Sequence, residues 1–231
     1  MSMDFSKFEK KLNINFKNKK LLRQAFTHRS YVNENPGAGE HNERLEFLGD
    51  AVLELIITRH LYDKYPDKAE GELTSYRSGL VNTNTLSETA SKIDMNEFLL
   101  LSKGESKDIG RARQYILANT FEALIGAIYL DLGYDIAYDF IADNLFGYID
   151  DMVDKKLWKD AKSFFQEKAQ DIEGVTPHYK LLKEDGPDHA KEFTVGVYIG
   201  DNLVGEGVGL SKQDAEQKAA EDGLKKKEWY K

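Results

Sequence analysis

The chain has 231 residues, of which 41% are hydrophobic and 31% charged, a composition typical of globular domains. It contains no cysteine, which excludes disulfides, thiolate metal sites and a cysteine nucleophile. Any metal ion must therefore be held by oxygen or imidazole ligands. The formal net charge of −8 argues against a broad electrostatic attraction to nucleic acid.

No segment of the sequence has the pattern of a membrane-targeting element. The N-terminal MSMDFSKFEKKL is charged and lacks the apolar core of a signal peptide. The least charged stretch, residues 114–130, contains Asn119 and Glu122 and is shorter than the roughly 20 apolar residues of a membrane span. We therefore expect a cytoplasmic protein that has no membrane partner.

Residues 1–150 carry apolar side chains at spacings of three and four, which predicts a succession of helices. Turn-forming residues interrupt this pattern at 35–37, near Pro66 and at 102–104. The sequence therefore predicts an all-α domain over residues 1–150.

The pattern changes after a polar, acidic stretch, and we expect a linker over residues 151–158 and a second domain over 159–231. A helix is predicted near 160–171, an alternating strand at 192–199 and a glycine-rich third strand at 203–210. Ser211 is placed to cap a final helix, with Asp214 three residues further on. The second domain is thus a small α+β unit of the order α-β-β-β-α.

The segment HNERLEFLGD, residues 41–50, opens a helix with carboxylates on one face. Helical periodicity places Glu43, Glu46, Asp50 and Glu54 together. The apolar residues are expected on the opposite face: Leu45, Leu48, Val52, Leu55 and Ile56. An ordinary solvated face is the simplest interpretation. However, Phe47 falls on the acidic side, and an aromatic residue there indicates a surface that meets a partner.

Glu122 is the only charged residue within the apolar segment 114–130. An ionised carboxylate in such surroundings is strongly disfavoured unless it is paired or binds a metal ion. Arg77 or Arg44 could supply a buried partner, and a metal site is the other interpretation. Asn119 lies one turn earlier on the same helix face. An all-oxygen site of this kind suits Mg²⁺ or Mn²⁺.

The segment 41–55, HNERLEFLGDAVLEL, closely resembles the signature of the ribonuclease III family. AFTHRSY at 25–31, EGELT at 70–74 with Arg77, and FEALIGA at 121–127 resemble further blocks of that family. The C-terminal unit is similar to the double-stranded-RNA-binding domain that these enzymes carry. The resemblance implies a homodimeric, Mg²⁺-dependent endonuclease that cleaves double-stranded RNA and leaves 5′-phosphate ends. Mn²⁺ would be a substitute, and no small-molecule cofactor is expected.

The resemblance also implies roles for individual residues. The catalytic residues would be Asp50 and Glu122, and the metal ligands Glu46, Asp50, Asn119 and Glu122. Auxiliary acidic roles fall on Glu43 and Glu70, and the aromatic contact with the partner subunit falls on Phe47. RNA contacts in the second domain fall on Gln166, Glu167, His189, Lys212 and Lys218. For the lysines, an ordinary solvated surface is the alternative.

Asn119 departs from the family pattern, which usually has Asp at this position. An amide keeps one oxygen ligand but removes a negative charge, so weaker metal binding is expected. A nuclease-deficient RNA-binding protein is therefore one alternative function. The net charge also leaves open a protein scaffold that binds no RNA.

Overall fold

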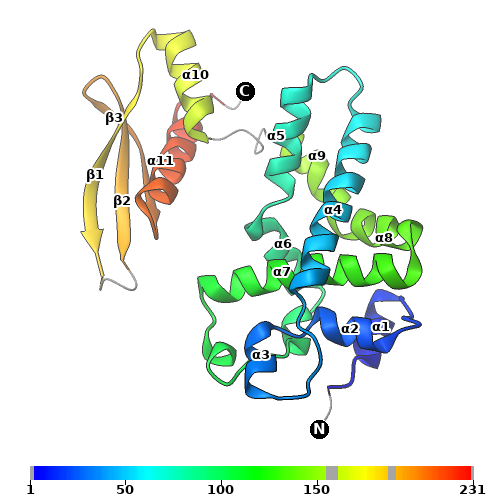
Figure 1. The fold of residues 1–231 in the computed structure, drawn as a ribbon. Coiled ribbons are helices and arrows are strands. Elements are labelled where there is room, and N and C mark those ends of the chain that lie inside the picture. The colour runs from blue at the N-terminus through cyan, green and yellow to red at the C-terminus, as the bar shows by residue number, and fades with distance from the viewer. Residues whose placement is uncertain (1–2, 155–160, 187–190, 230–231) are drawn as a thin grey trace. The chain divides into compact units, whose positions relative to one another are not determined.

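The computed structural model describes residues 3–154, 161–186 and 191–229 (Figure 1). The chain separates into two compact units, which divide between Asp151 and Met152. The N-terminal unit is helical and the C-terminal unit combines helices with one sheet, as the sequence predicts.

The described part of the N-terminal unit is built from α-helices joined by short turns and two 3₁₀ segments. The α-helices are α1 (Ser6–Leu12), α2 (Lys19–Ala25), α3 (Arg29–Glu34), α4 (Glu43–Lys64), α5 (Glu70–Leu80), α6 (Thr83–Lys92), α7 (Arg111–Leu132), α8 (Tyr134–Ile141) and α9 (Gly147–Asp154). The 3₁₀ segments are η1 (Met95–Phe98) and η2 (Glu105–Lys107), and η3 (Ala142–Phe146) is a π-helical segment. The predicted breaks at 35–37, Pro66 and 102–104 all fall between helices.

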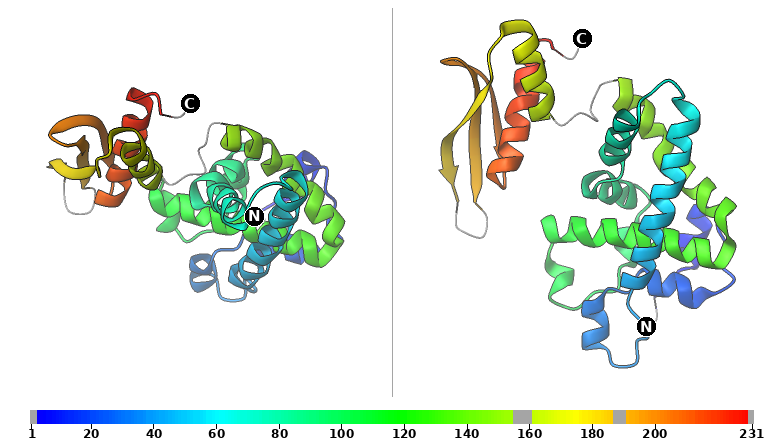
Figure 2. Two further views of the ribbon diagram at one scale, coloured as in Figure 1. Left: turned by 90° about the horizontal axis from the view of Figure 1, so that it is seen from above. Right: turned by 45° about the horizontal axis from the view of Figure 1, so that its top comes forward.

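Helix α7 forms the centre of this unit. Residues 116–118 and 123–128 of this helix are buried, which explains why its sequence is apolar around most of its circumference. Helix α4 crosses α7, and α2, α6 and α8 also pack against it (Figures 1 and 2). By length and composition α7 could cross a membrane, but 61% of its most apolar window is buried within the domain. These features are those of a core helix.

The C-terminal unit is an antiparallel sheet of order β1-β2-β3 with two helices on one face (Figures 1 and 2). Its elements are α10 (Ala161–Glu173), β1 (His178–Asp185), β2 (Glu192–Ile199), β3 (Asn202–Gly209) and α11 (Lys212–Lys226). Alternate residues of β2 point toward the helices, and Val195 and Val197 are buried there. The core is completed by Phe164 and Phe165 of α10 and by alanines of α11.

The glycines of β3 allow α11 to lie directly on the sheet. A β carbon added at Gly207 would lie 2.2 Å from the backbone nitrogen of Ala219, and one at Gly205 would lie 2.4 Å from that of Gly223. As predicted, the Ser211 hydroxyl caps α11 by accepting a hydrogen bond from the Asp214 amide at 3.1 Å.

Two local expectations differ from the structure. Helix α9 continues to Asp154, so the first four residues of the predicted linker 151–158 are helical, and 155–158 lie outside the described residues. Leu55 is 58% exposed, although it was expected on the core face of α4. The core side of this half of α4 is formed instead by Ile56, Ile57 and Leu61.

Candidate active site

Two helical glycines bring α4 and α7 into backbone contact. A β carbon added at Gly49 would lie 1.7 Å from the carbonyl oxygen of Glu122. One added at Gly126 would lie 2.2 Å from the carbonyl oxygen of Leu45. Because neither helix could approach so closely with larger residues, these glycines place Glu122 beside the acidic face of α4. The sequence analysis assigned no role to these two glycines. A glycine in the interior of a helix is unfavourable unless another group approaches closely, and this was the signal by which they could have been found.

Glu46 and Asp50 lie one turn apart on α4, close to this crossing. Glu46 is half-buried and Asp50 is exposed. Partial burial, and then the neighbouring charges of Glu43 and Asp50, raise the pKa of Glu46, while a hydrogen bond with the Asn119 side chain opposes this rise. Burial and the charge of Glu54 raise the pKa of Asp50. The four predicted metal ligands on α4 and α7 therefore share one neighbourhood.

Glu122 has the most perturbed carboxyl group of this neighbourhood. Its half-buried position, followed by the charges of Asp50 and Glu46, raises its pKa to about 8. The arginine partners considered from the sequence do not neutralise it. Arg77 donates a hydrogen bond to the Thr58 hydroxyl at 2.9 Å, and Arg44 is exposed. Within the described residues no salt bridge reaches Glu122, so its interpretation as half of a buried ion pair is wrong.

The two auxiliary carboxylates differ in position. Glu43 begins α4, where its charge acts on Glu46, and it pairs with Arg29 at 3.5 Å. Glu70 begins α5 and accepts a hydrogen bond from Thr74 at 3.4 Å. It is not among the groups that shift the pKa of Glu46, Asp50 or Glu122. The structure thus brings Glu43, but not Glu70, to the carboxylate cluster.

The predicted metal ligands form a donor set that fits a divalent cation such as Mg²⁺ or Mn²⁺; they are Glu46, Asp50, Asn119 and Glu122, and Glu43 lies beside them. The set offers three carboxylates and one amide oxygen, all hard ligands, and the carboxylates repel one another without a neutralising cation. As the side chains stand, no group of three or more acidic or histidine residues in the described parts of the chain is arranged to hold an ion. Asp50 is exposed, so its carboxylate is open to an ion that approaches from solvent.

Phe47 projects into solvent from α4, as its position in the helical pattern predicted. It is 81% exposed, and Leu55 and Tyr62 extend an exposed apolar stripe along the same helix. A hollow of about 470 Å³ lies between α4 and α5. It is lined by Thr58, Leu61, Tyr62, Lys68, Glu70, Leu73, Thr74 and Arg77. An exposed aromatic stripe beside a hollow is typical of an interaction surface.

The predicted RNA-contact residues of the second domain are mostly exposed. Gln166 and Glu167 lie on α10, and Lys212 and Lys218 on α11. Lys218 pairs with Asp214 at 3.1 Å, whereas Lys212 lies over the Phe193 ring at 5.9 Å. His189 lies outside the described residues. Lys212 also helps to lower the pKa of Glu184, so the charges of both lysines are partly offset by neighbouring carboxylates.

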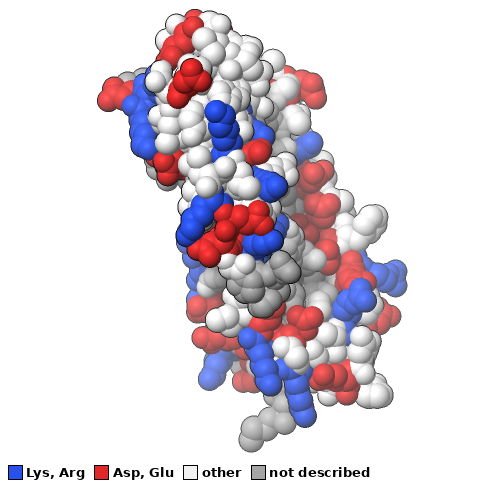
Figure 3. Space-filling view, turned by 90° about the vertical axis from the view of Figure 1, so that its left-hand side faces the viewer, with Lys and Arg blue, Asp and Glu red and all other residues white. Residues whose placement is uncertain are grey.

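Charge on this domain is mixed. Residues 159–231 contain 12 lysines against 15 acidic residues, a net charge of −3. On the face shown in Figure 3, basic and acidic side chains alternate over the surface instead of gathering by sign. Recognition must then depend on shape and on a few placed side chains, which is how double-stranded RNA is read.

Each of the two units matches a known protein family. Residues 18–149 match the family profile described as "Ribonuclease-III-like", and residues 161–227 match "Double-stranded RNA binding motif". Ribonuclease 3 of Borreliella afzelii is 47% identical over 220 residues, covering 95% of this chain and 90% of that protein. Ribonuclease 3 of Carboxydothermus hydrogenoformans is 48% identical over 218 residues, covering 94% and 92% respectively.

A solved structure of a relative has a fold similar to that of the N-terminal unit. The nuclease domain of ribonuclease III from Campylobacter jejuni, described for flexibility in a region involved in dimer formation, is 37% identical. It superposes with a TM-score of 0.55 and covers 61% of this chain and 98% of that one.

A helical nuclease domain with a carboxylate cluster, followed by a double-stranded-RNA-binding domain, defines an endoribonuclease that acts on double-stranded RNA. The chain belongs to the ribonuclease III family.

Proposed function

We propose that this endoribonuclease is Mg²⁺-dependent and cleaves each strand by water attack at phosphorus, leaving 5′-phosphate ends. The observation that carries the proposal is the uncompensated cluster of Glu46, Asp50 and Glu122 at the α4–α7 crossing. A bound Mg²⁺ would supply the positive charge and the Lewis acidity that activate water and stabilise the leaving oxygen.

The residues of the chain position the metal ligands and supply their negative charge. The close contact at Gly49 and Gly126 fixes the distance between the two helices that carry the ligands. Asn119, through its hydrogen bond to Glu46, restrains that carboxylate and opposes the rise in its pKa. Glu122 has a pKa of about 8, so near neutral pH it holds a proton until a cation neutralises the cluster. Metal loading is therefore expected to release a proton.

Hydrolysis by water is favoured over attack by the RNA's own 2′-hydroxyl. An internal attack needs no metal but requires a histidine or lysine base beside the scissile phosphate. Among the described residues, the groups that act on Glu46, Asp50 and Glu122 are carboxylates and an amide, with no histidine or lysine. In the proposed step water forms the new P–O bond and the bond from phosphorus to the 3′ oxygen breaks. The upstream fragment then ends in a 3′-hydroxyl, and the phosphate stays on the 5′ end of the downstream fragment.

We also propose that the enzyme works as a homodimer through the exposed stripe of Phe47, Leu55 and Tyr62. In a symmetric pair each stripe meets its own copy, and Phe47 could enter the hollow beside Tyr62 of the partner subunit. The region involved in dimer formation that is described for the Campylobacter nuclease domain supports a dimer, and the exposed stripe of this chain is the surface we assign to it. The proposed setting is RNA processing in the cytoplasm, including ribosomal and messenger precursors.

The test is a cleavage assay on an end-labelled RNA duplex several helical turns long, with Mg²⁺ and Mn²⁺ titrated in parallel. We expect metal-dependent fragments that a 5′-phosphate-dependent exonuclease degrades. Fragments with 5′-hydroxyl ends, or cleavage that persists in EDTA, would contradict the mechanism. An intact but still bound duplex at every metal concentration would favour an RNA-binding protein that Asn119 has deprived of catalysis.

A further inference from the structure

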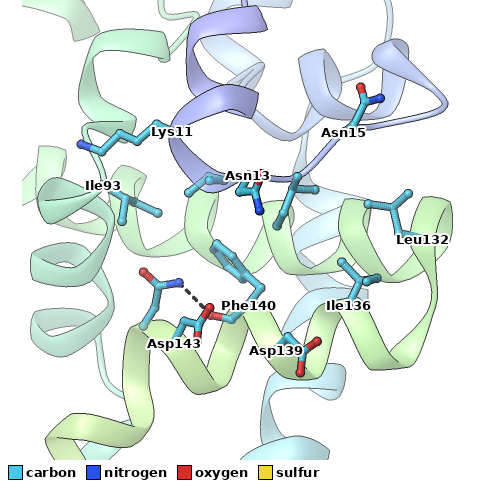
Figure 4. Close-up of a pocket in the computed structure, with 12 residues that line it drawn as sticks. Lys11, Asn13, Asn15, Ile93, Leu132, Ile136, Asp139, Phe140 and Asp143 are labelled. Carbon is cyan, nitrogen blue, oxygen red and sulfur yellow. Dashed lines mark hydrogen bonds between the residues drawn. The ribbon is translucent and has the colours of Figure 1, made fainter.

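A second concave site lies in the N-terminal unit, and its residues do not belong to the carboxylate cluster. It has a volume of about 550 Å³, within the range of roughly 300–1,000 Å³ usual for small-molecule sites. The turn after α1, the end of α6 and helices α7 and α8 with η3 enclose it (Figure 4). It is lined by Lys11, Leu12, Asn13, Ile14, Asn15, Ile93, Leu132, Ile136, Asp139, Phe140, Asp143 and Asn144.

The cavity has an apolar lining that the protein itself leaves partly uncovered. Ile14, Ile93 and Leu132 are half-buried, and Ile136 is 38% exposed, while Phe140 is buried beside them. Figure 4 shows Ile93, Leu132, Ile136 and Phe140 around the cavity, together with Asn13, which projects into the same space. Exposed apolar side chains in a concave site favour a ligand that covers them with hydrocarbon.

The charges around the cavity determine the sign of that ligand. Asp139 and Asp143 are exposed, and neither forms a salt bridge within the described residues. Asp139 lies on α8 and Asp143 lies four residues further on in η3, and both line the same cavity. Lys11, the one basic residue in the lining, is already paired with Asp94. The lining therefore has two uncompensated negative charges.

The backbone beside the cavity has an unusual conformation. Residues 142–146 form the π-helical segment η3, and such segments are rare and occur frequently at functional sites. The Asn144 side chain donates a hydrogen bond to the carbonyl oxygen of Phe140 at 2.7 Å, drawn as a dashed line in Figure 4. This bond fixes the turn that carries Asp143 next to the apolar lining.

We infer that this cavity binds a linear aliphatic diamine or polyamine. The methylene chain of such a molecule would cover Ile14, Ile136 and Phe140, and its ammonium groups would pair with Asp139 and Asp143. A simple metal ion would leave the apolar lining exposed, and a neutral apolar ligand would leave both carboxylates unpaired. The diamine class satisfies both features of the site.

The test is a titration of the full chain followed by NMR of its side-chain amides, at constant ionic strength. The probes are 1,4-diaminobutane and, as a matched monoamine, 1-aminobutane. We expect saturable shifts of the Asn13 and Asn144 amide signals with the diamine, and weaker binding of the monoamine. The double variant Asp139→Asn, Asp143→Asn should bind the diamine about tenfold more weakly or worse.

Asp135→Asn is the matched control, because Asp135 is an exposed carboxylate on the same helix that does not line the cavity. It should bind the diamine like the unmodified chain. Shifts that never saturate, or that are the same in the double variant, would show only counterion attraction to an acidic protein and would overturn the inference. Shifts confined to residues around Glu46 and Glu122 would overturn it too, because the diamine would then occupy the carboxylate cluster.

Discussion

Replacing Glu122 with Gln should stabilise the metal-free protein at alkaline pH. Burial and two like charges raise the pKa of Glu122 from its ordinary value of 4.5 to about 8. The folded state therefore binds this proton more tightly than the unfolded state. The stability it contributes is complete below about pH 4.5 and is lost as pH rises toward 8. Glu122→Gln keeps the shape of the side chain and removes the ionisation.

The size of this effect follows from the same shift. Without solvent screening, the rise in pKa corresponds to a change of about 5 kcal/mol in the free energy of unfolding. The carboxyl group is partly exposed, and screening by solvent reduces this change to about 2–3 kcal/mol. For a chain of this size that is about 5–10 °C in melting temperature. We therefore expect Glu122→Gln to melt higher than the unmodified chain at pH 9 in EDTA, with little difference at pH 4.5.

The assay is thermal unfolding by circular dichroism across this pH range, with Glu97→Gln as control. Glu97 is exposed on η1 and should show no pH-dependent difference. Adding Mg²⁺ at pH 9 should raise the melting temperature of the unmodified chain more than that of Glu122→Gln. An equal difference at both pH values, or a variant that is less stable at pH 9, would show that ionisation of Glu122 does not destabilise the folded state.

Three further changes test the crossing, the stripe and Asn119. Gly126→Ala should destabilise the chain by about 1–3 kcal/mol in denaturant unfolding, because its β carbon meets a carbonyl oxygen at 2.2 Å. In the same assay Gly71→Ala, in open space on α5, should be neutral or stabilising by up to about 1 kcal/mol, and equal effects would count against the close crossing. Phe47→Asp should shift the chain to monomer in sedimentation velocity, and an unchanged mass would exclude the stripe as the dimer contact. Asn119→Asp should lower the Mn²⁺ dissociation constant measured by calorimetry about tenfold, and unchanged affinity would remove Asn119 from the site.

The sequence predicted which residues form the site, but it did not predict which groups surround Glu122. Helical periodicity placed Phe47 outside the core, where it is 81% exposed, and gathered the carboxylates of α4. Whether Glu122 would meet an arginine or more carboxylates depended on where α4 crosses α7. That crossing is set by Gly49 and Gly126. The two glycines are visible in the sequence, but the backbone atoms that each one meets lie on the other helix and can be identified only in the folded domain.

Helical periodicity also misplaced one residue of α4. It predicted both Leu55 and Ile56 on the core face; Ile56 is buried there, whereas Leu55 is 58% exposed. The glycines of β3 were recognisable as a strand pattern. Their physical reason, the close approach of α11 to Gly205 and Gly207, is visible only in the packed domain.

We propose that the carboxylates at the α4–α7 crossing hold the catalytic metal. The most direct measurement compares the Mg²⁺-dependent cleavage rate of one RNA duplex by the unmodified chain, Glu122→Gln and Glu97→Gln, with duplex affinity measured alongside. Loss of a residue that only supports a ligand costs roughly 10–100-fold, so loss of a direct ligand should slow cleavage by at least about 100-fold. We predict this loss for Glu122→Gln with unchanged duplex affinity, and full activity for Glu97→Gln. Cleavage by Glu122→Gln at the unmodified rate would show that Glu122 does not hold the catalytic metal.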